Sequence, residues 1–124
     1  IVLLDLMSAP VKGNQSAVVS LNYYLRPSTD KVRFVGTAIG NVVAHEAGHF
    51  IGNWHTNNTN DVTSLMDSGG LGFWRMFQAG KDRIGGTADD GDTDFATDRY
   101  SPWEGFVGVE DTRNVTAWAF SAKR

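Results

Sequence analysis

All three histidines of the 124-residue chain lie in one short string, HEAGHFIGNWH, which runs from His45 to His55. His45 and His49 are four positions apart, so on a helix both imidazoles project from one face, one turn apart. Such a pair can bind one ion at the roughly 2.0–2.1 Å of a zinc–nitrogen bond. Gly52 lets the chain leave the helix in a conformation that other residues resist, so that His55 can return to the same ion. The spacing therefore predicts a metal site with three histidine ligands.

The same string holds a candidate general base. Three protein ligands leave a fourth coordination position for water, which is typical of catalytic rather than structural zinc sites. Zinc lowers the pKa of such a water to about 7. Glu46 follows the first histidine directly and could take the proton and later deliver it to a leaving amine. The pattern therefore predicts hydrolysis with Glu46 as the catalytic residue.

This pattern resembles the signature of the metzincin zinc metallopeptidases, His-Glu-x-x-His-x-x-Gly-x-x-His followed by a Met-turn. The match is complete at the fixed positions His45, Glu46, His49, Gly52 and His55. The resemblance implies a secreted or extracellular zinc endopeptidase, with a protein or peptide substrate that pairs in extended form with an edge strand. It is specific over residues 42–70 and loose elsewhere.

The Met-turn is the second part of the resemblance. Residues 64–67, Ser-Leu-Met-Asp, are similar to it. In the family, the methionine of this tight turn forms a hydrophobic floor beneath the metal, and the resemblance gives that role to Met66; an ordinary core methionine is the alternative. Thr56 after the third histidine, and Ser68 where astacins and serralysins have a zinc-binding tyrosine, depart from the best-known subfamilies. The chain therefore resembles a prokaryotic-type metzincin outside them.

The fold that the resemblance implies is α+β. A twisted mixed sheet would pack on the zinc-binding helix, and a smaller C-terminal subdomain would hold the Met-turn and a terminal helix. We expect a single domain over residues 1–124, with residues 1–55 as its upper part and residues 56–124 as the subdomain. Because 44 residues precede the first histidine, we expect part of the sheet to be missing or reduced and the chain to be a fragment or processed part of a longer one.

Local patterns predict the elements that must position these residues. Apolar runs predict strands at Ile1–Leu6 and Ser16–Leu25, with the second as the candidate edge strand, and Lys31–Val35 is expected to be a short extended piece. A helix is expected from about Thr37, as N-cap, to Asn53. Its core-facing residues at helical spacing would be Val42, Val43, Ala47, Phe50 and Ile51.

The end of the chain predicts a second helix, from about Asp111 to Ala122. Val115, Trp118 and Ala119 would share one face of it.

An acidic, glycine-rich segment from Gly80 to Asp98 holds six aspartates. Calcium takes roughly six to eight oxygen ligands, and such a loop could supply them, although the spacing does not match an EF-hand. A solvated acidic loop is the equal alternative. The candidate calcium ligands are Asp82, Asp89, Asp90, Asp92 and Asp94.

An aromatic run, Phe73 to Phe77, follows the Met-turn. In metzincins the segment after that turn helps to wall the substrate pocket. The resemblance therefore suggests Phe73 and Trp74 as pocket residues; an ordinary core contact is the alternative.

Composition excludes several other classes of protein. The chain has no cysteine, which excludes disulfides, thiol catalysis and cysteine-ligated metal. A net charge of −3 without a basic stripe argues against a nucleic-acid partner. No apolar run approaches the roughly 18 residues of a membrane span. Two functional alternatives to an endopeptidase remain: a non-catalytic zinc-containing binding or structural module of an extracellular assembly, and a different zinc hydrolase such as a deacylase or amidase.

Overall fold

The computed structural model describes residues 24–67, 73–91 and 93–121. Its elements in chain order are the helix α3 (Lys31–Phe50), the one-turn helix α4 (Phe73–Met76), the strand β1 (Thr97–Arg99), the 3-10 helix η2 (Pro102–Glu104), the strand β2 (Val109–Asp111) and the helix α5 (Thr112–Ser121). The two strands pair antiparallel, and they form the only sheet within these residues. This part of the chain is therefore α+β.

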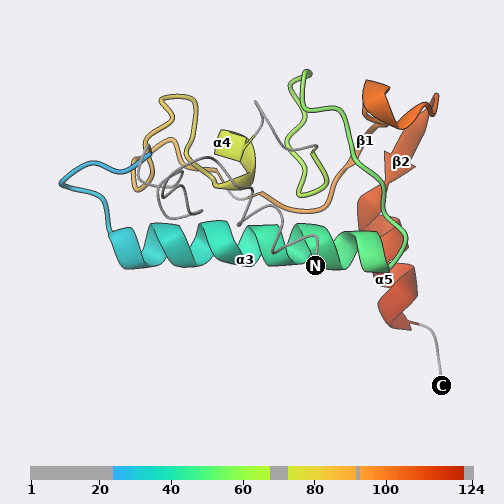
Figure 1. The fold of residues 1–124 in the computed structure, drawn as a ribbon, viewed down its shortest axis with the longest axis horizontal. Helices are drawn as coiled ribbons and strands as arrows, with labels where there is room; N and C mark the ends of the chain where they lie inside the picture. Colours follow the sequence, from blue (N-terminus) through green and yellow to red (C-terminus); the bar gives the residue numbers. More distant parts are fainter. Residues whose placement is uncertain (1–23, 68–72, 92, 122–124) are drawn as a thin grey trace, which may run out of the picture.

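The long helix α3 organises the arrangement (Figure 1). The helix α4 and the loops lie along one side of α3, while the β1–β2 hairpin and α5 gather at its C-terminal end. No helix in the ranges that the structure describes combines the length and the apolar character needed to cross a membrane.

The start of α3 differs from the sequence prediction. Asp30 is the N-cap, and its side chain accepts a hydrogen bond from the backbone N–H of Arg33 at 3.1 Å. The predicted cap Thr37 therefore lies inside the helix, and the extended piece expected at residues 31–35 is wrong because those residues form the first turns. The helix ends at Phe50, three residues before the predicted end at Asn53, and Gly52, predicted as the stop, follows it with a φ of 106°.

The face that α3 buries also differs from the prediction. Of the five residues expected to face the core, Val42 is the only buried one; Val43 is 47% exposed and Phe50 is 92% exposed. The observed core joins one face of α3 to the segment around α4, through Phe34, Ala38, Val42, Met76, Phe77 and Ala79. Burying one side chain as large as Phe34 contributes about 1.5–3 kcal/mol. Because α3 carries apolar residues on two faces, their periodicity does not show which face packs against the rest of the chain.

The terminal helix is confirmed as α5, but its predicted apolar face is not buried. Trp118 is 74% exposed, and Thr112 is the buried residue of this helix. The hydroxyl of Thr112 ties the helix to the chain before β1, donating to the carbonyl oxygen of Ala96 at 2.8 Å.

The predicted strand at residues 1–6, and residues 16–23 of the second one, lie outside the described residues. Tyr24 and Leu25, the last two residues of that second strand, are not in a strand.

Candidate metal centre

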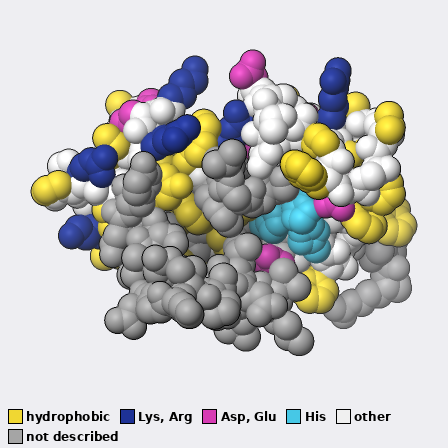
Figure 2. All heavy atoms as spheres, turned by 45° about the horizontal axis from the view of Figure 1, so that its top comes forward, with side chains coloured by type: hydrophobic (Ala, Val, Ile, Leu, Met, Phe, Trp, Pro, Cys, Tyr) yellow, Lys and Arg dark blue, Asp and Glu magenta, His cyan; other side chains and the backbone are white. Residues whose placement is uncertain are grey.

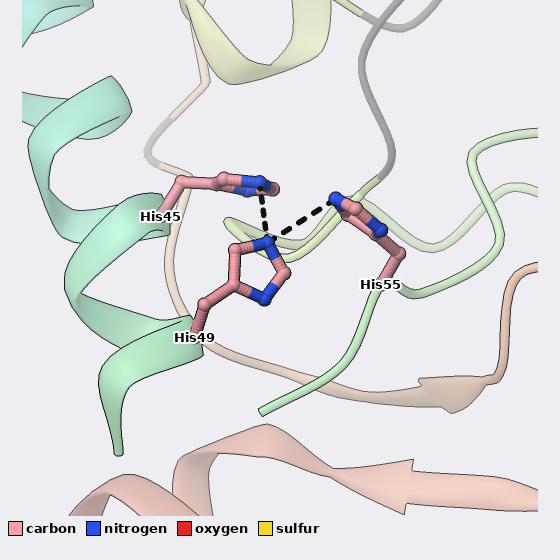
Figure 3. Close-up of side chains that lie close together, drawn as sticks. All are labelled: His45, His49 and His55. Atoms are coloured by element: carbon pink, nitrogen blue, oxygen red, sulfur yellow. Dashed lines mark hydrogen bonds between the residues drawn. The ribbon is translucent and has the colours of Figure 1, made fainter. Parts of the chain in front are cut away.

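The three histidines converge at the C-terminal end of α3 (Figure 3). His45 and His49 lie on successive turns of the helix, and the chain turns back after Gly52 to present His55 from the opposite side. The Nε2 atom of His49 lies 3.1 Å from Nε2 of His45 and 3.2 Å from Nε2 of His55. The three rings therefore converge as the spacing of the motif predicts.

This separation fits a metal ion. Tetrahedral bonds of about 2.0–2.1 Å to one ion hold neighbouring nitrogen atoms about 3.3 Å apart, close to the distances observed. Within the described ranges, this is the one group of histidine, aspartate or glutamate side chains close enough to hold a metal. The three histidines thus lie close enough to bind one ion, and imidazole nitrogen suits zinc as well as copper, nickel or iron.

Backbone carbonyl groups orient the two helical rings. Nδ1 of His45 donates to the carbonyl oxygen of Leu65 at 2.6 Å, and Nδ1 of His49 donates to that of Asn53 at 2.9 Å. With the proton on Nδ1, each Nε2 presents a lone pair to the centre. Burial also lowers the pKa of His45 to about 4, so this ring is neutral near pH 7. The neutral form is the one that binds a metal.

A carboxylate orients the third ring. Nδ1 of His55 bonds to Oε1 of Glu104, the last residue of η2. The position of η2 is fixed by Ser101, whose backbone N–H donates to the carbonyl oxygen of His55 at 2.9 Å. A carboxylate behind a ligating histidine fixes its tautomer and raises its basicity. With all three Nδ1 atoms bonded, three lone pairs face one another, and they repel unless a proton or a metal ion lies between them.

Glu104 was not predicted from the sequence. It lies 49 positions from His55, and no local pattern links the two residues.

A tight turn at residues 64–67 lies directly against α3. Met66 is fully buried, and its backbone N–H donates to the hydroxyl of Ser64 at 3.1 Å. A Cβ on Gly48, between the two helical ligands in the sequence, would lie only 2.5 Å from Sδ of Met66. The thioether therefore packs on the helical turn that carries the ligands, and the same turn supplies the Leu65 carbonyl that orients His45.

The residue after the third histidine fastens this turn to the third ligand. The backbone N–H of Thr56 donates to the carbonyl oxygen of Met66 at 2.7 Å, and its hydroxyl donates to Oδ1 of Asp67 at 3.0 Å. Burial raises the pKa of Asp67 to about 6, although the bonds from Thr56 and Ser64 oppose this rise. In the sequence Thr56 stands out only as a departure from a family pattern, whereas in the structure it joins the chain after His55 to the turn of residues 64–67.

Glu46 lies on α3 one residue after His45 and three residues before His49, so its side chain neighbours that of His49 on the helix surface. Its side chain is 8% exposed. It has no hydrogen bond or ion pair with another residue that the structure describes. Figure 2 shows that the histidine cluster reaches the molecular surface with acidic side chains beside it.

A second glutamate outside the motif supports the chain next to the third ligand. Glu110 on β2 is buried, and its carboxylate accepts the backbone N–H of Trp54 at 3.2 and 3.1 Å. Burial raises the pKa of this carboxyl. The β1–β2 hairpin thus supports the metal centre twice, through Glu104 and through Glu110.

The described residues of the acidic loop do not form a comparable group of metal-binding side chains. Oδ2 of Asp89 accepts the backbone N–H groups of Lys81 and Asp82 at 2.8 and 3.1 Å, and Oδ2 of Asp90 accepts that of Gly86 at 2.6 Å. A hydrogen bond from the Thr87 hydroxyl is the main cause that lowers the pKa of Asp89, with the backbone bond from Asp82 next.

The described candidates for calcium, Asp82, Asp89, Asp90 and Asp94, are not brought together as a metal-binding group. Asp92 lies outside the described residues. The calcium site stays a prediction.

Trp74 lies in a different place from the metal centre. It lines a cavity of about 450 Å³ together with Asp61 and Lys81, and none of the three histidines lines that cavity. The guanidinium group of Arg75 lies 5.1 Å from the centre of the Trp74 ring. The pocket role suggested for Trp74 stays a prediction, as does that of Phe73, whose side chain lies outside the described part.

The chain matches no protein-family model, no curated protein and no solved structure.

Proposed function

We propose that the chain is a zinc-dependent endopeptidase with a metzincin-like fold, in which Glu46 is the general base. The observation that carries the proposal is the convergence of three Nε2 atoms whose Nδ1 atoms are all bonded to acceptors. The packing of Met66 against Gly48 supports it, because the Met-turn role assigned to Met66 requires a methionine beneath the ligands. The proposal includes secretion from the cell, which follows from the family resemblance.

The three histidines would hold the ion, which supplies Lewis-acid chemistry: it activates water and polarises the carbonyl group of the bond to be cleaved. Glu46 accepts the proton as the water attacks, and it returns that proton to the nitrogen of the departing amine. Burial of its carboxylate limits competing contact with bulk water. Glu104 and the carbonyl groups of Leu65 and Asn53 hold the rings in the tautomer that binds metal.

Replacing Glu46 tests the proposal directly. The zinc-loaded wild type and the variant Glu46→Gln would be incubated with a mixed-sequence peptide library, and products would be identified by mass spectrometry. We expect cleavage of internal bonds by the wild type and a loss of at least about 100-fold in the variant, because general bases typically contribute that much or more. Zinc affinity should stay within a few-fold. Asp82→Asn, an exposed carboxylate of the acidic loop, is the matched control and should cleave like the wild type.

The other outcomes separate the alternatives. Zinc-loaded wild type that cleaves no peptide would contradict the endopeptidase and favour a non-catalytic module. Hydrolysis of acylated small molecules without peptide cleavage would indicate a deacylase or amidase. Cleavage that persists in Glu46→Gln or after removal of zinc by a chelator would refute the mechanism.

A further inference from the structure

Exposed aromatic residues lie next to residues of the metal centre in the chain. Trp54 precedes His55 and is 49% exposed, while Trp103 precedes Glu104 and is 88% exposed. Phe106, in the loop between η2 and β2, is 44% exposed. We call Trp54, Trp103 and Phe106 the aromatic surface. Figure 2 shows hydrophobic side chains at the molecular surface beside the histidine cluster. Large apolar groups gathered next to a site indicate an interaction rather than ordinary surface composition.

Part of the aromatic surface is held rigidly. The rings of Trp54 and Phe106 meet edge to face, with centroids 4.9 Å apart, and Phe106 also contacts Tyr100 at 5.4 Å. The backbone of Trp54 is fixed by the buried carboxylate of Glu110. Aromatic groups that are already fixed lose little conformational entropy when a ligand binds. The surface is therefore organised in advance for contact with another molecule.

The aromatic surface offers no free charged group with which a charged ligand could pair. Between residues 100 and 109 the only charged residue is Glu104, and its carboxylate bonds to His55. Glu110 likewise bonds to the backbone of Trp54. Neither carboxylate is therefore free to pair with a basic ligand. What the surface offers is aromatic and aliphatic area, which favours a large apolar side chain.

We propose that the aromatic surface binds a large apolar or aromatic side chain of the peptide substrate, within about three residues of the bond that is cleaved. This inference rests on the proposed endopeptidase function. An extended peptide advances about 3.3 Å per residue, and Trp54 and Trp103 each adjoin a residue of the metal centre in the chain. A substrate lying over the metal would therefore present its nearby side chains to these rings.

The test compares two exposed tryptophans. Three zinc-loaded proteins would be compared: the wild type, Trp103→Ala and the control Trp118→Ala. The tryptophan replaced in the control is 74% exposed on α5. Each protein would be incubated with a peptide library in which every position in turn is fixed as Phe or Ser. We expect about a tenfold preference for Phe at one position near the cleaved bond, consistent with one buried aromatic contact. The preference should fall below about twofold in Trp103→Ala and persist in Trp118→Ala.

A second readout needs no catalysis. Binding of the same Phe and Ser libraries to zinc-loaded Glu46→Gln, with and without Trp103→Ala, would be measured by titration. The same preference in binding, lost with Trp103→Ala, supports the aromatic surface even if no cleavage is found, and in that case only the endopeptidase falls. Cleavage without a preference for Phe, or with a preference that survives Trp103→Ala, overturns this inference and leaves the endopeptidase standing. If neither cleavage nor preferential binding is found, both the endopeptidase function and this inference are overturned.

Discussion

The metal centre and the acidic loop of residues 80–98 are both rich in side chains that bind metals, but among the residues that the structure describes only the three histidines lie close enough together to hold an ion. In the metal centre, each Nδ1 has an acceptor, so each ring presents Nε2 to the same point. In the loop, the carboxylates of Asp89 and Asp90 accept backbone N–H groups of their own loop. A site is therefore made by partners that direct the ligand atoms inward, and the density of ligand residues in the sequence is a weaker guide.

The largest loss of zinc affinity should follow the removal of one histidine from the metal centre, and the matched removal of a carboxylate from the acidic loop should cause none. We expect His49→Ala to lower zinc affinity by more than about 100-fold, because the outer partners of a ligand alone contribute about 10–100-fold. Asp90→Ala is the matched change in the loop and should leave zinc affinity unaltered. Titration with zinc in a competing chelator measures both. Equal losses in the two variants would erase the contrast between the regions.

An intermediate effect should follow from removing a partner rather than a ligand. Glu104→Ala leaves Nδ1 of His55 without its acceptor, so we expect its zinc affinity to fall by about 10–100-fold. Glu104→Gln keeps an acceptor without the charge, so its zinc affinity should fall less. Circular dichroism would check that both variants remain folded. Wild-type zinc affinity in folded Glu104→Ala would show that the partner does not direct the ring.

The smallest effect should come from a change in the packing of α3 on Met66, and it should be seen in the stability of the fold. Gly48→Ala places a Cβ 2.5 Å from Sδ of the fully buried Met66, and overpacking of this kind typically costs about 1–3 kcal/mol. Gly36→Ala, on the same helix, meets nothing within 4 Å and should stabilise the helix by about 0.5–1 kcal/mol. Urea unfolding of the metal-free variants compares them. If both alanines stabilise equally, Met66 does not pack closely on α3.

The convergence of the three histidines could be predicted because their spacing in the sequence is local. A four-residue separation on a helix and a glycine turn place the three histidines near one another. The partners are different: Glu104 lies 49 positions from His55, and Thr56 lies 11 positions from Asp67. Such pairs depend on how the hairpin and the turn dock, which no local pattern encodes.

The prediction of the fold is limited in the same way, because local patterns do not encode tertiary contacts. The existence of α5 follows from a local signal and is confirmed, and α3 ends at Phe50, shortly before the glycine that was predicted to stop it. Its start was misplaced because Thr37 and Asp30 are both acceptable caps, and the side-chain bond of Asp30 decides between them. The buried face was misassigned because Val43 and Phe50 follow helical spacing as well as Phe34 and Val42 do. Only tertiary contacts choose between such faces.

The most direct test of the central claim is X-ray absorption spectroscopy at the zinc edge, on protein loaded with one equivalent of zinc. If His45, His49 and His55 bind the ion through Nε2, the spectrum will show three imidazole nitrogens at about 2.0–2.1 Å, and His49→Ala will lose this pattern. A shell of oxygen ligands alone, or a spectrum unchanged in His49→Ala, would place the metal elsewhere and contradict the account.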